Sequence, residues 1–270
     1  MTTLLRLWLI LLVGLSGLVK ASPESLLSPS GLVLSQLLSE PLSIAVAANF
    51  AGPLNALLPA FEQATGIQTR VTVGSSGALF AQIQHGAPYD VFLSADSKRP
   101  QALVSNALIP ANAVTTYAIG QLALVGRVNS VTDHALLADS VRLAIADPDL
   151  APYGRAAREL LQASGVWSLL QTRLIRGTNV QQTLQFWQTG NVDAALIAAS
   201  QCVTYQLDCK PVPALYEPVI QQMAVIVTHN KARTLAGRSL ARYLQSTAVQ
   251  QQLAEMGYRL VADAHNKDPF

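Results

Sequence analysis

The sequence predicts an α/β protein of two lobes, each a mostly parallel sheet flanked by helices, with a cleft between them. Two observations support this fold class. Short apolar segments alternate with amphipathic segments of helical period, which is typical of βαβ units and parallel sheets. Two further apolar strands, at about 117–125 and 223–227, separate groups of these units. We expect both strands to cross between the lobes and to form a hinge.

The first lobe is expected to contain three strand–helix units. Pro53 lies near the start of the first helix, where a missing N–H costs nothing, and Gly66 ends that helix. In parallel sheets, ligands sit beyond the carboxyl ends of the strands, and Asn49 and Ser76 fall at such ends. The strands of this lobe are predicted at 42–47, 68–73 and 90–94, and the helices at about 53–66, 76–86 and from 97 onward.

The second lobe repeats the pattern, and two helices close the chain in the first lobe. Its strands are predicted at 141–145, 174–176 and 194–198, and its helices at about 155–163 and 180–187. The closing helices are expected at about 231–245 and 247–256. The predicted organisation is therefore 42–117 for lobe 1, 118–221 for lobe 2 and 222–270 for the return to lobe 1.

The N-terminal segment is typical of an export signal. Residues 1–21 contain Arg6, an apolar core from Leu7 to Val13 and a small-residue cleavage site ending at Ala21. The apolar core is short for a bilayer span, which needs about 20 apolar residues, although an uncleaved anchor is the alternative. Residues 22–41 are rich in Ser and Pro and are predicted to be a linker. We expect a periplasmic protein.

The composition argues against several classes of function. Only 13% of the 270 residues are charged, and the formal net charge is +2. Nucleic-acid binding usually needs concentrated positive charge, so we expect no nucleic-acid partner. The only cysteines are Cys202 and Cys209, and in an exported chain they favour a disulfide, with two inert thiols as the alternative. The four histidines show no metal-ligand spacing, so no protein-ligated metal is expected.

Four strand-to-helix junctions consist of small or neutral residues. They are Ala-Ala-Asn-Phe at 47–50, Gly-Ser-Ser-Gly at 74–77, Ala-Pro-Tyr-Gly at 151–154 and Gly-Thr-Asn-Val at 177–180. A helix N-terminus presents unpaired N–H groups and the positive end of the helix dipole, so each junction can contact an anion. Four such junctions predict a converging oxyanion site that relies on hydrogen bonds rather than on Lys or Arg.

These junctions, together with three further stretches, carry a family resemblance. The further stretches are Gly-Ala-Pro-Tyr-Asp-Val-Phe-Leu-Ser-Ala-Asp at 86–96, Asp147-Pro148 leading to Tyr153-Gly154, and Tyr-Glu-Pro at 216–218. From about residue 42 to residue 260 the chain resembles periplasmic molybdate-binding proteins of the ModA type. These are the solute receptors of ABC importers, and they have the type II periplasmic binding protein fold. The stretch at 86–96 is the most specific part of the match.

The resemblance implies a set of ligand-binding residues. Both lobes would donate hydrogen bonds to the oxyanion, from Ala48, Asn49, Ser76, Tyr153 and Val180. Ser76 would use its hydroxyl and N–H, whereas Tyr153 and Val180 would act mainly through their N–H groups. Ala48 replaces a hydroxyl residue of the relatives, so its side chain can donate nothing. The ligand would be molybdate or tungstate, with the metal bound only as the oxyanion. The chain would need no cofactor, act as a monomer and deliver its ligand to an ABC permease.

Alternative interpretations exist for the same residues. Ser76 or Asn49 alone can be a helix cap, Tyr153 can pack in a turn and Val180 can belong to the core, but their joint placement favours a ligand site. Within the receptor class, sulfate or another tetrahedral oxyanion is the alternative ligand. An exported serine hydrolase using Ser76 is a remote alternative, because Ala78 stands where the nucleophile elbow has its last glycine. We therefore expect a receptor and not an enzyme.

Overall fold

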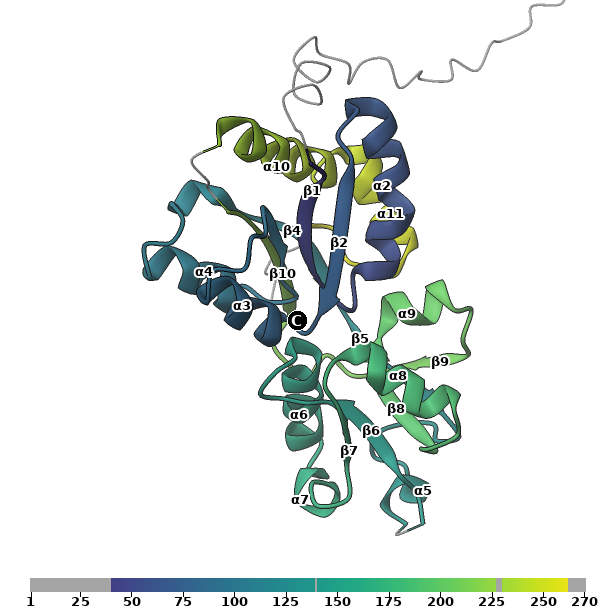
Figure 1. The fold of residues 1–270 in the computed structure, drawn as a ribbon. Helices are drawn as coiled ribbons and strands as arrows, with labels where there is room; N and C mark the ends of the chain where they lie inside the picture. The colour runs from purple at the N-terminus through teal and green to yellow at the C-terminus, as the bar shows by residue number, and fades with distance from the viewer. Residues whose placement is uncertain (1–39, 139, 227–229, 262–270) are drawn as a thin grey trace, which may run out of the picture.

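The computed structural model of the chain describes residues 40–138, 140–226 and 230–261. The expected signal at 1–21 and nearly all of the expected linker lie outside these residues. Among the described helices, none combines the length and the apolar character that a bilayer crossing requires. The described chain forms two lobes stacked end to end, each built on its own five-stranded sheet, which confirms the predicted two-lobed α/β fold (Figure 1). Each sheet is mixed, with two parallel and two antiparallel strand pairs, rather than mostly parallel.

The first sheet has the strand order β2-β1-β3-β10-β4. Strand β1 lies between β2 and β3 and pairs in parallel with both, whereas β10 runs antiparallel to β3 and β4. Helices α2, α10 and α11 cover one face, and α3 and α4 cover the other (Figure 1). The bounds are β1 Leu42–Ala47, β2 Thr69–Gly74, β3 Val91–Leu93, β4 Val114–Gly120, β10 Val219–Val225, α2 Ala51–Thr65, α3 Ser76–Gln84, α4 Lys98–Ser105, α10 Lys231–Leu244 and α11 Thr247–Glu255.

The alternation of side chains along β1 explains why both faces of this sheet are covered. Ile44 and Val46 pack with Phe61 and Leu240 on the face of α2 and α10, whereas Ala45 packs with the core under α3 and α4. All six residues of β1 are buried. A strand buried on both sides belongs in the middle of a parallel sheet, and its carboxyl end then points toward the interlobe cleft.

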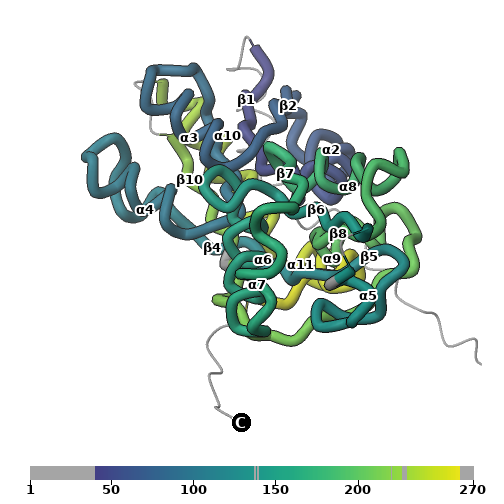
Figure 2. Tube along the Cα trace, turned by 90° about the horizontal axis from the view of Figure 1, so that it is seen from below, coloured from purple at the N-terminus to yellow at the C-terminus, as the bar shows by residue number. Residues whose placement is uncertain are grey.

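The second sheet has the order β7-β6-β8-β5-β9, with parallel pairs around β6 and antiparallel pairs around β5. Seen from the second-lobe end, helices α3, α4 and α10 of the first lobe extend to the left of this lobe (Figure 2). Its elements are β5 Leu122–Gly126, α5 His134–Leu137, β6 Leu143–Ala146, α6 Pro152–Ala163, α7 Trp167–Leu170, β7 Ile175–Gly177, α8 Val180–Gln188, β8 Ala194–Ala198, α9 Ala199–Thr204 and β9 Cys209–Pro211.

The predicted crossing strand at 117–125 is two strands in the structure. β4 keeps the chain in the first sheet up to Gly120, and β5 begins the second sheet at Leu122, so the chain changes sheets at Gln121. The return strand β10 begins at Val219, four residues before the predicted start at 223. The lobe boundaries proposed from the sequence, 42–117, 118–221 and 222–270, stay a prediction.

One further difference and one confirmed prediction, the disulfide, concern the second lobe. Helix α6 begins at Pro152 rather than at about residue 155, because Pro is well suited to the first helical position. A disulfide joins Cys202 of α9 to Cys209 of β9, with their Cα atoms 6.0 Å apart. This bond fixes the edge strand β9 to the helix that precedes it.

Candidate functional site

A small cavity lies between the lobes at the carboxyl ends of their strands. Its cavity volume is about 10 Å³, far below the roughly 300–1,000 Å³ of a pocket for a drug-sized ligand. All five residues proposed from the sequence line it. The lining consists of Ala47, Ala48, Asn49, Ser75, Ser76, Ala95, Ala151, Pro152, Tyr153, Asn179 and Val180.

Three helices begin at this cavity. Ser76 is the first residue of α3, Tyr153 lies in the first turn of α6 and Val180 is the first residue of α8. The backbone N–H groups of these residues donate to no acceptor among the described residues, as expected for the first turn of a helix. α3 belongs to one lobe and α6 and α8 to the other, so the positive ends of three helix dipoles converge on one small space.

Ser76 is not a helix cap, and this alternative interpretation of it is wrong. The cap of α3 is Ser75, whose side chain accepts a hydrogen bond of 3.2 Å from the N–H of Ala78. The Ser76 hydroxyl oxygen instead accepts the N–H of Ala95 at 2.9 Å, and the residue is fully buried. An oxygen fixed in this way keeps its own O–H for donation, and Ser76 and Ala95 both line the cavity.

Ala48 and Asn49 differ in what they can donate. The N–H of Ala48 is bound to the carbonyl of Gly74 at 2.9 Å, and its methyl side chain has no polar atom. In this structure Ala48 therefore has no free donor and forms part of the cavity wall, and its role as a ligand contact stays a prediction. Asn49 keeps a free N–H among the described residues, while its side-chain amide donates to the Tyr258 hydroxyl at 3.3 Å.

The Tyr153 side chain belongs to a buried polar chain that joins the lobes. The Gln221 side-chain amide donates to the Tyr153 hydroxyl at 3.2 Å, and the Tyr117 hydroxyl donates to the Gln221 carbonyl oxygen at 2.9 Å. Gln221 is fully buried and lies where the pairing of β10 with β4 shifts register. A Cβ on Gly120, the last residue of β4, would lie 2.0 Å from the Tyr153 hydroxyl and 2.7 Å from the Gln221 side-chain nitrogen, so a side chain there would displace this polar chain.

Burial raises the pKa values of Tyr117, Tyr153 and Tyr258 above their ordinary value. In the unfolded chain these phenols lose their protons at about pH 10. Above that pH the unfolded state releases protons that the folded state keeps, so folding becomes less favourable. We predict that these tyrosines do not change the free energy of unfolding below about pH 9 and that they lower it steadily above pH 10. Urea denaturation between pH 8 and 11 measures this. A Tyr258→Phe variant should show a shallower decline.

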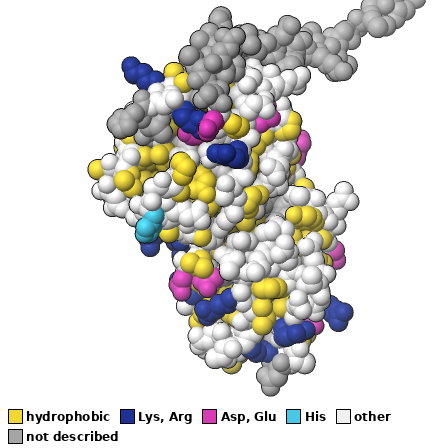
Figure 3. Space-filling view, viewed as in Figure 1, with side chains coloured by type: hydrophobic (Ala, Val, Ile, Leu, Met, Phe, Trp, Pro, Cys, Tyr) yellow, Lys and Arg dark blue, Asp and Glu magenta, His cyan; other side chains and the backbone are white. Residues whose placement is uncertain are grey.

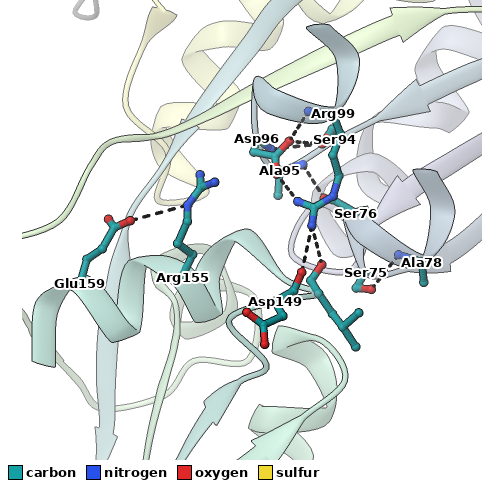
Figure 4. A network of polar contacts seen from close by, with 11 residues as sticks. Ser75, Ser76, Ala78, Ser94, Ala95, Asp96, Arg99, Asp149, Arg155 and Glu159 are labelled. Atoms are coloured by element: carbon teal, nitrogen blue, oxygen red, sulfur yellow. Dashed lines mark hydrogen bonds and ion pairs between the residues drawn. The ribbon is translucent and has the colours of Figure 1, made fainter. Parts of the chain in front are cut away.

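No charged side chain lines the cavity in the described part of the chain. Arg99 of the first lobe, which pairs with the buried Asp96, reaches across the cleft to the Asp149 carbonyl. Figure 4 shows the Arg99 guanidinium pointing from the first lobe toward the turn before α6. On the face seen in Figure 3, charged side chains of both signs are scattered rather than gathered on one lobe. The cavity thus offers hydrogen-bond donors without a countercharge.

Sequence reasoning missed three residues that support the site. Ala95 fixes Ser76 through its N–H, which no side-chain pattern could indicate. Tyr258 lies 209 positions from Asn49, whose carbonyl accepts its hydroxyl at 3.0 Å. Gln221 offered a signal, since it is a polar residue in a strand that is otherwise mostly apolar.

The chain is similar to known proteins over nearly all of its described length. Residues 42–259 match the bacterial extracellular solute-binding protein family. The molybdate-binding protein ModA of Azotobacter vinelandii is 33% identical over 240 residues, which cover 86% of this chain and 94% of that protein. ModA of Rhodobacter capsulatus is 33% identical over 245 residues, with 89% and 96% covered. The solved structure of the Azotobacter vinelandii periplasmic molybdate-binding protein matches with a TM-score of 0.72 at 31% identity, covering 81% of this chain and 99% of that one.

Proposed function

The chain belongs to the bacterial extracellular solute-binding proteins, and we propose that it captures molybdate or tungstate between its lobes and delivers the anion to the membrane permease of an ABC importer. The observation that carries this proposal is the cavity itself. Segments from both lobes surround it, helix N-termini converge on it, and its described lining is uncharged. Such a site suits a small, fully deprotonated dianion.

The donors account for tight binding without a charged partner. The N–H groups of Asn49, Ser76, Tyr153 and Val180 and the Ser76 hydroxyl make five donors. A hydrogen bond to a charged group contributes roughly 1.5–3 kcal/mol, so five give roughly 8–15 kcal/mol before ordering costs. Dissociation constants between micromolar and nanomolar need about 8 to 12 kcal/mol. Donors already held at helix starts lose little entropy on binding.

The other two functions considered have less support. A serine hydrolase needs a base that activates its nucleophile, and the described lining of the cavity contains no His, Asp or Glu beside Ser76. Sulfate fits the same donor pattern and differs mainly in size. The proposal also includes export through the signal at 1–21, action as a monomer and transfer to a permease. Membership of the solute-receptor family supports these parts of the proposal.

Selectivity among oxyanions tests the proposal. Because Mo–O and W–O bonds are longer than S–O bonds, a fixed ring of donors discriminates by size. We predict that molybdate and tungstate bind at least about tenfold more tightly than sulfate. Hydrogen phosphate should compete poorly, because its proton needs an acceptor and the described lining has no carboxylate. Calorimetric titration of the purified mature protein at constant ionic strength measures all four affinities. Equal affinity for sulfate and molybdate would contradict the assignment.

A further inference from the structure

The cleft is spanned by a contact that does not touch the cavity. The Arg99 guanidinium, near the start of α4 in the first lobe, donates to the backbone carbonyls of Asp149 and Leu150 at 3.3 and 3.4 Å. These carbonyls belong to the turn before α6 in the second lobe. The Leu150 carbonyl also accepts the N–H of Gly77 at 3.0 Å. Arg99 and Gly77 thus donate to the same carbonyl of the opposite lobe. Figure 4 shows the Arg99 part of this contact.

Arg99 is held in place by its own lobe. One nitrogen of its guanidinium pairs with the Asp96 carboxylate, whose side chain is only 2% exposed. The other oxygen of Asp96 accepts the Arg99 backbone N–H at 3.0 Å and the Ser94 hydroxyl at 3.1 Å. Asp96 neutralises the charge of the guanidinium and fixes its plane, so the second terminal nitrogen of the guanidinium faces the other lobe. This is a forked geometry that a lysine ammonium cannot reproduce.

The contact links two ligand donors. On one side, Asp96 directly follows Ala95, whose N–H holds the Ser76 hydroxyl. On the other side, Leu150 lies just before Ala151 and Tyr153, at the N-terminus of α6. The approach is close, because a Cβ on Gly77 would lie 2.8 Å from the Leu150 carbonyl oxygen and 3.0 Å from the Arg99 guanidinium. The bridge therefore joins the two halves of the cavity at close range.

We propose that Arg99, oriented by Asp96, is a latch that holds the lobes closed and so sets how long the ligand stays bound. This proposal rests on the proposed function, because the retained ligand is taken to be an oxyanion. Arg99 is a positioning residue, since it does not line the cavity. A latch acts after the lobes meet, so its loss raises the dissociation rate rather than lowering the association rate.

The test measures release and closure separately. Two variants are used. Arg99→Met removes the guanidinium, and Arg99→Lys keeps a cation beside the buried Asp96 carboxylate while removing the nitrogen that reaches the other lobe. The control is Arg155→Met, because Arg155 pairs with Glu159 at 3.7 Å on the same helix, within one lobe (Figure 4). Each protein is loaded with radiolabelled molybdate and chased with an excess of unlabelled molybdate. Small-angle X-ray scattering then gives the radius of gyration of each ligand-free protein.

We expect both Arg99 variants to release molybdate roughly tenfold faster than wild type, a change of about 1.4 kcal/mol, with association rates within about twofold. Their ligand-free radius of gyration should exceed those of wild type and Arg155→Met. If Arg99→Met associates more slowly than wild type and Arg99→Lys restores the wild-type association rate, then Arg99 attracts the anion electrostatically. That result would overturn the latch. An unchanged release rate together with an unchanged radius of gyration in both variants would overturn the latch too. If wild type does not retain molybdate but the Arg99 variants still open, the latch stands and the proposed ligand fails.

Discussion

Replacing Gly154 by alanine is expected to lower the free energy of unfolding by about 3 kcal/mol, at the upper end of the usual cost of overpacking. Gly154 lies in the first turn of α6, packed against the end of β6. A Cβ there would lie 2.2 Å from the Ala146 carbonyl oxygen and 2.6 Å from that of Asp147. Both obstacles are backbone, so no side chain can rotate away. The start of α6, with the Tyr153 N–H that lines the cavity, has to move.

Gly52 provides the matched control. It also lies in the first turn of a helix, α2, but a Cβ there would meet only the Thr204 side chain, at 3.5 Å. Gly52→Ala should therefore leave stability unchanged or slightly higher, because alanine favours helices more than glycine does. Differential scanning calorimetry of both variants measures the contrast, with a fall of roughly 6–12 °C expected for Gly154→Ala. Equal melting temperatures for the two variants would contradict the close packing of α6 on β6.

The fold was predictable because its signals are local and repeated. The alternation of strands and helices from β1 to α4 follows directly from apolar periodicity, and each helix is marked by Pro, Ser or Gly near its ends. The position at which the chain changes sheets was not predictable. Residues on both sides of Gln121 are buried, so hydropathy continues across the boundary. Only hydrogen bonding to two different sheets separates β4 from β5.

The candidate site was predictable as a set of positions but not as a set of donors. Helix starts after strands indicated where Ser76, Tyr153 and Val180 would gather, and the cavity contains all three. Whether Ser75 or Ser76 caps α3 could not be read from two adjacent serines, because the decision depends on the N–H of Ala95, 19 residues away. The same limit applies to Ala48, whose N–H is taken up by Gly74 of the neighbouring strand.

The second large effect is expected on binding, from Ser76→Ala. The hydroxyl of Ser76 is held by the N–H of Ala95 and is left with its own proton to donate into the cavity. Without it, a buried dianion lacks one donor, which should cost roughly 1.5–3 kcal/mol of binding, or about 10- to 150-fold in affinity for molybdate. The ligand-free protein should also lose about 1–2 kcal/mol of stability, because the Ala95 N–H is then buried without an acceptor.

Ser75→Ala separates the two consequences, because the two serines are adjacent but have different partners. Ser75 caps α3 through the N–H of Ala78, and losing a cap costs about 1 kcal/mol of stability. Both variants should therefore unfold at lower urea concentration than wild type, by similar amounts. Only Ser76→Ala should show the large loss in a calorimetric titration with molybdate, since the Ser75 hydroxyl serves the helix. Similar losses of affinity in the two variants would mean that the helix start as a whole matters, and that the Ser76 hydroxyl is no ligand donor.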